Sequence, residues 1–232
     1  MAIALEETGL AYEHRLVDIR KGDKDDPANL AGASTGKLPV IRDLAPAACG
    51  NPKTVCESSV ILTYIADKKG QPLPAHKRRR QRRQAQQWLY RQGANLGPTS
   101  GQALRFPAFA LLLAPDFANT CAHNRCFRIM ADHWRVLDRR LGDNRYIAGE
   151  EYSIADINYY PWIIYFDPAE AIDALPNIRQ WRNLGAIKLV VRRAYRRADE
   201  LKTGHLIHDK NMSVFPLEDI RRNMIVICSI MQ

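Results

Sequence analysis

Two neighbouring residues with oxygen-bearing side chains, Glu57 and Ser58, stand at the start of a segment whose apolar pattern predicts a helix. The amide groups of a first helical turn have no partner within the helix, and the helix dipole adds partial positive charge there. The hydroxyl and amide of Ser58 could therefore hold an anion such as a carboxylate. The same residues could instead be an ordinary helix cap. The local pattern alone leaves both interpretations open.

The cysteines could in principle supply a nucleophile, metal ligands or disulfides, and their number and spacing argue against each. They are Cys49, Cys56, Cys121, Cys126 and Cys228. An odd number of scattered cysteines without a CxxC pair fits neither a disulfide framework nor a zinc site. For Cys56, beside Glu57, a buried inert thiol is favoured over a catalytic one. We expect reduced thiols and no metal site.

A basic run, KRRRQRR, covers residues 77 to 83 and raises the question of nucleic-acid binding. The chain carries a formal net charge of +9, which favours acidic partners, including anionic small molecules. No aromatic residue is interleaved with the run for base stacking. The solvated opening of a long helix is the competing interpretation and the one we adopt, so nucleic acid is not an expected partner.

The composition is that of a soluble globular protein, with 46% hydrophobic and 25% charged residues. The longest apolar run, Met224 to Met231, is far shorter than the roughly 20 residues that cross a bilayer. The first residues place Glu6 and Glu7 directly after a short apolar stretch, without a basic leader. We therefore expect a cytoplasmic protein that does not enter membranes.

The first third of the chain predicts a small mixed unit of helices and strands. We expect a helix over residues 2–8 that ends at Gly9, strands over 12–19, 37–43 and 54–56, and a helix over 58–69. The last two strands would form a hairpin. In the helix, Val60, Ile61, Tyr64 and Ile65 are expected on one face.

Beyond a Pro-containing stretch the chain changes to long helical patterns. We divide it into a first domain over residues 1–70, a linker over 71–76, an all-helical domain over 77–203 and a tail of uncertain structure over 204–232. Met130, Trp134, Leu137 and Leu141 form one apolar stripe. Ser153 and Asp156 predict a capping box, in which each side chain binds the backbone amide of the other residue.

Six short motifs in this order resemble the glutathione S-transferase family, and most closely its bacterial Nu-type, disulfide-bond oxidoreductase-like branch. They are GKLPV (Gly36 to Val40), ES (Glu57 and Ser58), QWL (Gln87 to Leu89), NLGPTSGQ (Asn95 to Gln102), VLDRRL (Val136 to Leu141) and GEEYSIADI (Gly149 to Ile157). The resemblance covers about residues 1 to 200. It implies a thioredoxin-like α/β N-terminal domain, truncated at its start, followed by an all-α C-terminal domain.

The resemblance also implies a ligand and the residues that bind it. Glutathione would be the co-substrate, without a metal, usually in a homodimer. The Leu38-Pro39 peptide bond would be cis, and the backbone of Leu38 would pair with the cysteinyl unit of glutathione as an added strand does. Glu57 and Ser58 would hold the γ-glutamyl carboxylate. Lys37 would contact a glutathione carboxylate, or else be a solvated strand-end lysine.

The resemblance implies a catalytic role for Arg125 alone. Counted back without gaps from VLDRRL, this residue falls at the position of an arginine that Nu-type proteins direct into the active site. The alternative is a solvated arginine on a helix. In this family the nucleophile is the glutathione thiol, activated by a hydrogen-bond donor in the loop after the first strand. Met1 already lies in the helix that follows that loop, so the donor has no counterpart in this sequence.

The absent first strand would lie in the middle of a four-stranded sheet, and its neighbours would be left with unpaired backbone groups unless the chain rearranges. We therefore expect Met1 to be an internal methionine of a longer reading frame, which an intact mass of 26.4 kDa for the natural protein would contradict. Two functions follow. The protein is a glutathione transferase or glutathione-dependent disulfide oxidoreductase acting on a small electrophile or a disulfide, or a non-catalytic transferase-like scaffold or ligand-binding protein.

Overall fold

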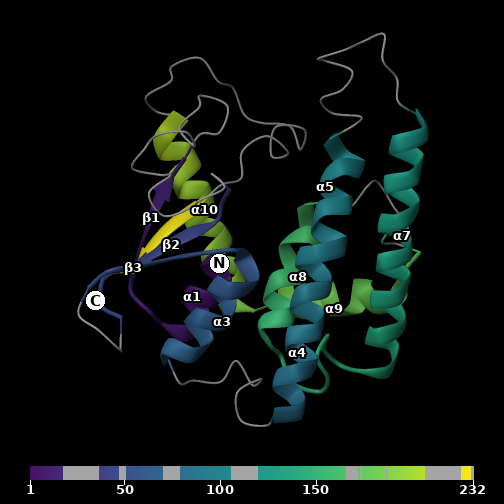
Figure 1. Cartoon of the computed structure of the whole chain (residues 1–232), viewed down its shortest axis with the longest axis horizontal. Coiled ribbons are helices and arrows are strands. Elements are labelled where there is room, and N and C mark those ends of the chain that lie inside the picture. The colour runs from purple at the N-terminus through teal and green to yellow at the C-terminus, as the bar shows by residue number, and fades with distance from the viewer. Residues whose placement is uncertain are drawn as a thin grey trace. The chain divides into compact units, whose positions relative to one another are not determined.

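The computed structural model describes residues 1–17, 37–46, 51–69, 79–105, 120–165, 172, 174–186, 188–206 and 226–230. The chain divides into two compact units. The first comprises Met1–Pro72 together with Ala186–Gln232, and the second comprises Leu73–Gly185. The first unit combines strands with helices and the second is helical, which is a thioredoxin-like domain followed by an all-α domain as predicted (Figure 1).

In the described residues of the first unit there are seven elements. They are α1 (Ala2–Thr8), β1 (Tyr12–Leu16), β2 (Val40–Asp43), β3 (Lys53–Cys56), α3 (Ser58–Lys69), α10 (Leu189–Leu206) and β4 (Val226–Ile230). The predicted helix over 58–69 and the hairpin of β2 and β3 are confirmed. The strand predicted over 12–19 ends at Leu16, and that predicted over 37–43 begins at Val40.

The strand order in the sheet is β1-β4-β2-β3. β4 runs antiparallel to β1 and parallel to β2, and Figure 1 shows it in yellow between them. We expected the facing edges of β1 and β2 to lack a partner strand. Instead, both edges pair with β4, which lies in the segment 204–232 whose structure the sequence did not predict. The other edge of β2 pairs antiparallel with β3.

Helix α3 packs on this sheet through a face that differs in part from the predicted one. Ile61 and Ile65 are fully buried as expected, but Val60 is 48% exposed. The buried face instead includes Leu62 and Ala66. The predicted and the observed sets have the same spacing, so spacing alone allows either face, and the buried face is the predicted one turned by one residue.

Helix α10 belongs to the first unit, although the sequence-based limits placed residues up to 203 in the helical domain. Its partner is α1, where Glu6 accepts a hydrogen bond from Arg193 Nε at 2.9 Å and from the Tyr12 hydroxyl at 2.6 Å. Lys188 Nζ lies 3.2 Å from a carboxylate oxygen of Glu7. These charge-paired contacts between segments more than 180 residues apart in the chain could not be read from local pattern.

The described part of the second unit contains six elements. They are α4 (Arg79–Arg91), the π-helix η3 (Gln92–Leu96), α5 (Gly97–Arg105), α7 (Thr120–Asp143), α8 (Ile154–Tyr165) and α9 (Pro176–Ala186). The predicted stripe on α7 is confirmed, because Met130, Trp134, Leu137 and Leu141 are all buried.

Asp156, near the start of α8, organises the core of the second unit. Its carboxylate accepts from the Ser153 amide at 2.9 Å, as the capping box predicted, and also from the Ile147 amide at 3.0 Å and Trp181 Nε1 at 2.8 Å. The Ser153 hydroxyl accepts from the amide of Ala155 rather than that of Asp156. Burial raises the pKa of the Asp156 carboxyl, and these hydrogen bonds only partly oppose that rise.

Candidate functional site

The strand register brings most of the predicted site residues to one end of the sheet in the first unit. Val40, the first residue of β2, lies opposite Cys56, the last residue of β3. Leu38 and Pro39 directly precede Val40, and Glu57 directly follows Cys56. Two segments separated by a hairpin therefore meet where the sheet ends, and the helix α3 begins at the same place.

The segment before β2 has the backbone form that the resemblance implied. The Leu38-Pro39 peptide bond is cis. Lys37 is exposed, and Leu38 and Pro39 are half-buried. The segment thus presents its main chain at the end of a strand, where an extended ligand could pair with it.

Glu57 has the one positive φ angle, 67°, found among the described non-glycine residues. A bulky residue in this region is strained, and such strain is common at ligand-binding sites. The carbonyl of Glu57 accepts the first hydrogen bond of α3, from the Ile61 amide at 2.9 Å. Ser58 is therefore the first residue of the helix, where amide groups without intrahelical partners can receive an anion.

The other end of β2 is anchored to α3 by a buried carboxylate that the sequence did not single out. Asp43 is fully buried and accepts from the Tyr64 hydroxyl at 2.5 Å, from Lys68 Nζ at 2.6 Å and from the Ala45 amide at 3.0 Å. Burial by itself raises the pKa of Asp43, but the bonds from Lys68 and Tyr64 outweigh it and hold the pKa below the ordinary value. The spacing of Tyr64 and Lys68, one helical turn apart, was the available signal.

Arg125 lies on α7 of the second unit, with an exposed side chain. It is therefore not in the same compact unit as Lys37, Leu38, Pro39, Glu57 and Ser58. The structure describes each unit by itself, so a catalytic role for Arg125 stays a prediction.

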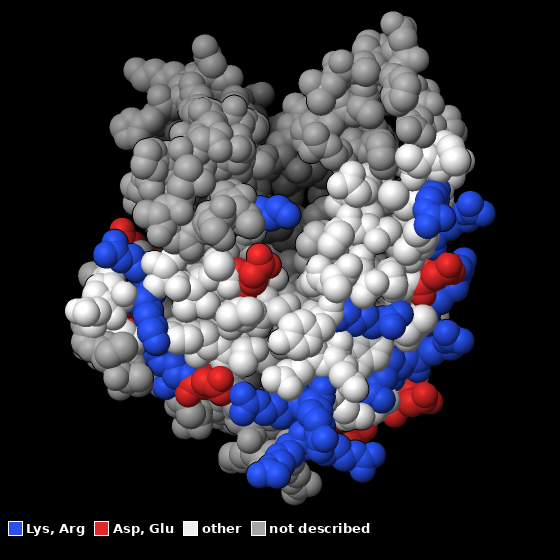
Figure 2. Space-filling model, viewed as in Figure 1, with Lys and Arg blue, Asp and Glu red and all other residues white. Residues whose placement is uncertain are grey.

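The basic run opens α4 as expected of a solvated helix end. Arg79, Arg80, Arg82 and Arg83 are all exposed. Figure 2 shows Lys and Arg side chains in blue in the lower part of the view, next to single acidic groups in red. Lys77 and Arg78 lie outside the described residues.

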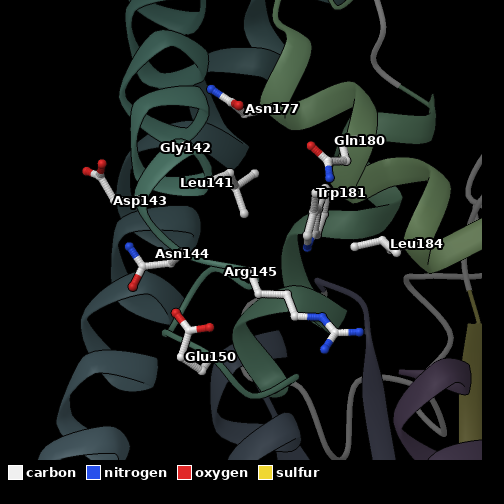
Figure 3. A pocket seen from close by; sticks show the side chains of 10 residues that line it. All are labelled: Leu141, Gly142, Asp143, Asn144, Arg145, Glu150, Asn177, Gln180, Trp181 and Leu184. Carbon is white, nitrogen blue, oxygen red and sulfur yellow. The ribbon is translucent and has the colours of Figure 1, made fainter.

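The second unit contains a pocket of about 530 Å³ between the end of α7, the following loop and α9. Figure 3 shows Trp181 and Gln180 of α9 on one side and Leu141 and Asp143 of α7 on the other. The Trp181 indole that lines it already donates to Asp156. None of the predicted glutathione-binding residues lines this pocket.

Among the described residues, no group of three or more His, Cys, Asp or Glu side chains is placed to hold a metal ion. The described free thiols are Cys56, Cys121 and Cys126. Cys56 was predicted to be buried, but its side chain is only half-buried. Cys49 and the side chain of Cys228 lie outside the described part of the chain. No described helix has the length and apolar character needed to span a membrane.

Sequence reasoning missed β4, whose residues are mostly β-branched. The segment Val226-Ile-Cys-Ser-Ile230 has the composition of a strand. Strand pairing across more than 180 residues carries no local sequence signature.

Two family models match the chain. The N-terminal domain of glutathione S-transferases matches residues 1–68, and the C-terminal domain matches residues 122–183. The disulfide-bond oxidoreductase YfcG of Escherichia coli is 36% identical over 163 residues, which are 70% of this chain and 73% of that protein.

Solved structures give the same result. A glutathione transferase of Burkholderia graminis, solved with two glutathione molecules per subunit, has a TM-score of 0.76 at 32% identity and covers 83% of this chain and 80% of its own. A glutathione transferase of Pseudomonas putida, solved with one glutathione disulfide per subunit, has a TM-score of 0.73 at 30% identity, with coverages of 83% and 84%.

Proposed function

This chain belongs to the glutathione S-transferase family, and on that premise we propose that it binds glutathione at the sheet end formed by Leu38, Pro39, Glu57 and Ser58. We further propose that the thiolate of the bound glutathione reduces a disulfide or attacks an electrophilic carbon. The observation that carries the proposal is the Val40–Cys56 register, which places these residues at one end of the sheet.

Each end of glutathione finds a complementary group there. The γ-glutamyl carboxylate is an anion, and Ser58 offers a hydroxyl and an amide at the positive end of α3. The cysteinyl unit has one N–H and one C=O, which match the backbone groups of Leu38. Lys37, exposed beside Leu38, can pair with a second carboxylate. Relatives solved with bound glutathione or glutathione disulfide support this choice of ligand.

The chemistry requires only that the glutathione thiol be ionised. In disulfide reduction the thiolate sulfur attacks one sulfur of the substrate, the S–S bond breaks, and the second substrate sulfur leaves as a thiolate. Attack by a second glutathione thiolate on the mixed disulfide releases the other half of the substrate and forms oxidised glutathione. In conjugation the thiolate forms a C–S bond with an electrophilic carbon. Either a leaving group departs with the electron pair of its bond to that carbon, or an activated double bond opens and its other end takes a proton from water. The proposal assigns no residue to activation of the thiol.

The direct test is binding of glutathione to the full chain by calorimetry, with Ser58→Ala as the variant. Loss of a hydrogen bond to a charged group is expected to weaken binding by about tenfold or more. Thr63→Ala is the matched control, because the Thr63 hydroxyl bonds within α3 to the Ser59 carbonyl at 3.0 Å and lies away from the helix start. Equal affinity of wild type and Ser58→Ala would contradict the proposed site.

Turnover separates the two functions. Reduction of a model disulfide or conjugation of a model electrophile by the glutathione-bound protein supports an enzyme. Binding without turnover of either substrate supports a non-catalytic transferase-like protein. A homodimer in the cytoplasm is proposed from the family resemblance, and light scattering on the purified protein tests the dimer.

A further inference from the structure

Strand β4 is the element that makes one sheet of the first unit. β1 and β2 do not pair with each other; β4 pairs with both, over five residues of β1 and three of β2. Without β4 the described strands would be a single strand and a two-stranded hairpin. A two-stranded hairpin is marginally stable in water, whereas three or more strands with a packed face are stable.

β4 also reaches the end of the sheet where the candidate site lies. It runs parallel to β2, with Cys228 opposite Ile41, so β4 and β2 begin at the same end. At this end Val226, the first residue of β4, lies opposite Leu16, the last residue of β1. Leu38 and Pro39 precede β2 at this end, and Glu57 follows β3 there.

Through β4, β2 becomes an internal strand. Ile41 lies opposite Val55 of β3 on one side and opposite Cys228 of β4 on the other. Its side chain is fully buried. The main chain that begins at Leu38 therefore depends for its position on both ladders of β2, in addition to the Asp43 anchor to α3.

We propose that β4 is a positioning element of the glutathione site, so that pairing of β4 with β1 and β2 and binding of glutathione are thermodynamically coupled. This inference rests on the proposed function. When β4 leaves the sheet, β2 loses one of its two ladders and the segment before it loses its fixed position. Because coupling is reciprocal, glutathione must stabilise β4 in the sheet by the factor by which β4 strengthens glutathione binding.

The register is tested first, by a cross-link in the full chain. His14 lies opposite Cys228, and residues opposite each other in an antiparallel pair come within disulfide distance. His14→Cys should therefore form a disulfide with the native Cys228 under mild oxidation, which peptide mapping identifies. Glu13→Cys is the matched control, because neighbouring positions face opposite sides of a strand. Absence of the disulfide in His14→Cys, or equal linking by Glu13→Cys, overturns the inference.

The coupling is tested by hydrogen exchange and calorimetry on Cys228→Pro. Proline in an internal strand removes a ladder bond and is not tolerated there. We expect faster exchange of the amides of residues 12–16 and 40–43 without ligand, and at least tenfold weaker glutathione binding. Cys228→Ser, which keeps the backbone amide of β4 and a side chain of similar size, is the matched control and should leave both measurements unchanged.

The outcomes separate this inference from the proposed function. If wild type binds glutathione and Cys228→Pro binds it equally well despite faster exchange in β1 and β2, the coupling is wrong and the proposed function stands. If exchange in β1 and β2 does not change, the role of β4 is wrong. If wild type does not bind glutathione, the proposed function is wrong and the coupling with it, while the exchange result still decides whether β4 holds the sheet together.

Discussion

Lys68 Nζ lies 2.6 Å from each carboxylate oxygen of Asp43, and this ion pair joins the last residue of β2 to the last turn of α3. Asp43 has no solvent exposure, and the Lys68 side chain is 12% exposed. The pair thus ties the strand that leads from Leu38 to the helix that begins at Ser58. Both elements of the candidate site depend on it for their relative position.

Replacement of Lys68 by Met should destabilise the first unit by about 3 kcal/mol, because it leaves a buried carboxylate without its counter-ion. Exchange of the Ile41 amide should become roughly a hundredfold faster. Lys53→Met is the matched control, since Lys53 lies opposite Asp43 on β3 but is exposed. All four tryptophans lie in the second unit, so tryptophan fluorescence should not change. Equal exchange rates of the Ile41 amide in Lys68→Met and Lys53→Met would contradict a stabilising role of the Asp43–Lys68 ion pair.

The Asp43 ion pair should also make the first unit sensitive to acid. Burial opposes ionisation of Asp43, but the bonds from Lys68 and Tyr64 more than offset it and lower its pKa. A lowered folded-state pKa gives stability that is present above the ordinary Asp value of about 3.9 and is lost as the pH falls through the lowered pKa. Carboxyl NMR titration should show the Asp43 pKa below the ordinary value in wild type. An ordinary or raised value would contradict this account.

In the second unit, Asp156→Ala should cost about 3 kcal/mol or more of stability. The substitution leaves the Ile147 amide, the Ser153 amide and the Trp181 indole without their buried acceptor. Denaturation followed by tryptophan fluorescence reports this unit directly. Asp132→Ala is the control: Asp132 is 70% exposed and pairs with Arg135 at the surface, so its loss should cost less than about 0.5 kcal/mol.

Two helical glycines of the second unit predict opposite effects of the same substitution. A Cβ at Gly185 would overlap the ring of Tyr160, whereas at Gly101 it would meet nothing within 4 Å. Gly185→Ala should therefore destabilise the unit by about 1 to 3 kcal/mol through overpacking. Gly101→Ala should stabilise it by roughly 0.5 to 1 kcal/mol, because alanine loses less backbone entropy in a helix. A melting temperature raised by both variants would show that Tyr160 yields easily.

Local chemistry was enough to predict the elements with strong patterns. The stripe of Met130, Trp134 and Leu137 predicted the buried face of α7, and Ser153 with Asp156 predicted the start of α8. The prediction that Val60 lies on the buried face of α3 was wrong, because an apolar residue type does not indicate which side of a helix packs on the sheet. The motifs from Gly36 to Val40 and at Glu57 and Ser58 predicted the residues of the candidate site. The resemblance they carry also predicted the cis Leu38-Pro39 bond, which is confirmed.

By itself, the sequence determined the family, through the resemblance of six motifs along the chain. It also determined the hairpin and the starts of α3 and α8, which follow from patterns within about twenty residues. Only the tertiary structure decided what completes the sheet and which helix joins the first unit. Pairing of Ile41 with Cys228 and of Glu6 with Arg193 joins residues 187 positions apart in each case. Such contacts depend on which backbone edges and charges remain unsatisfied once the local elements have formed, and that is a property of the folded chain as a whole.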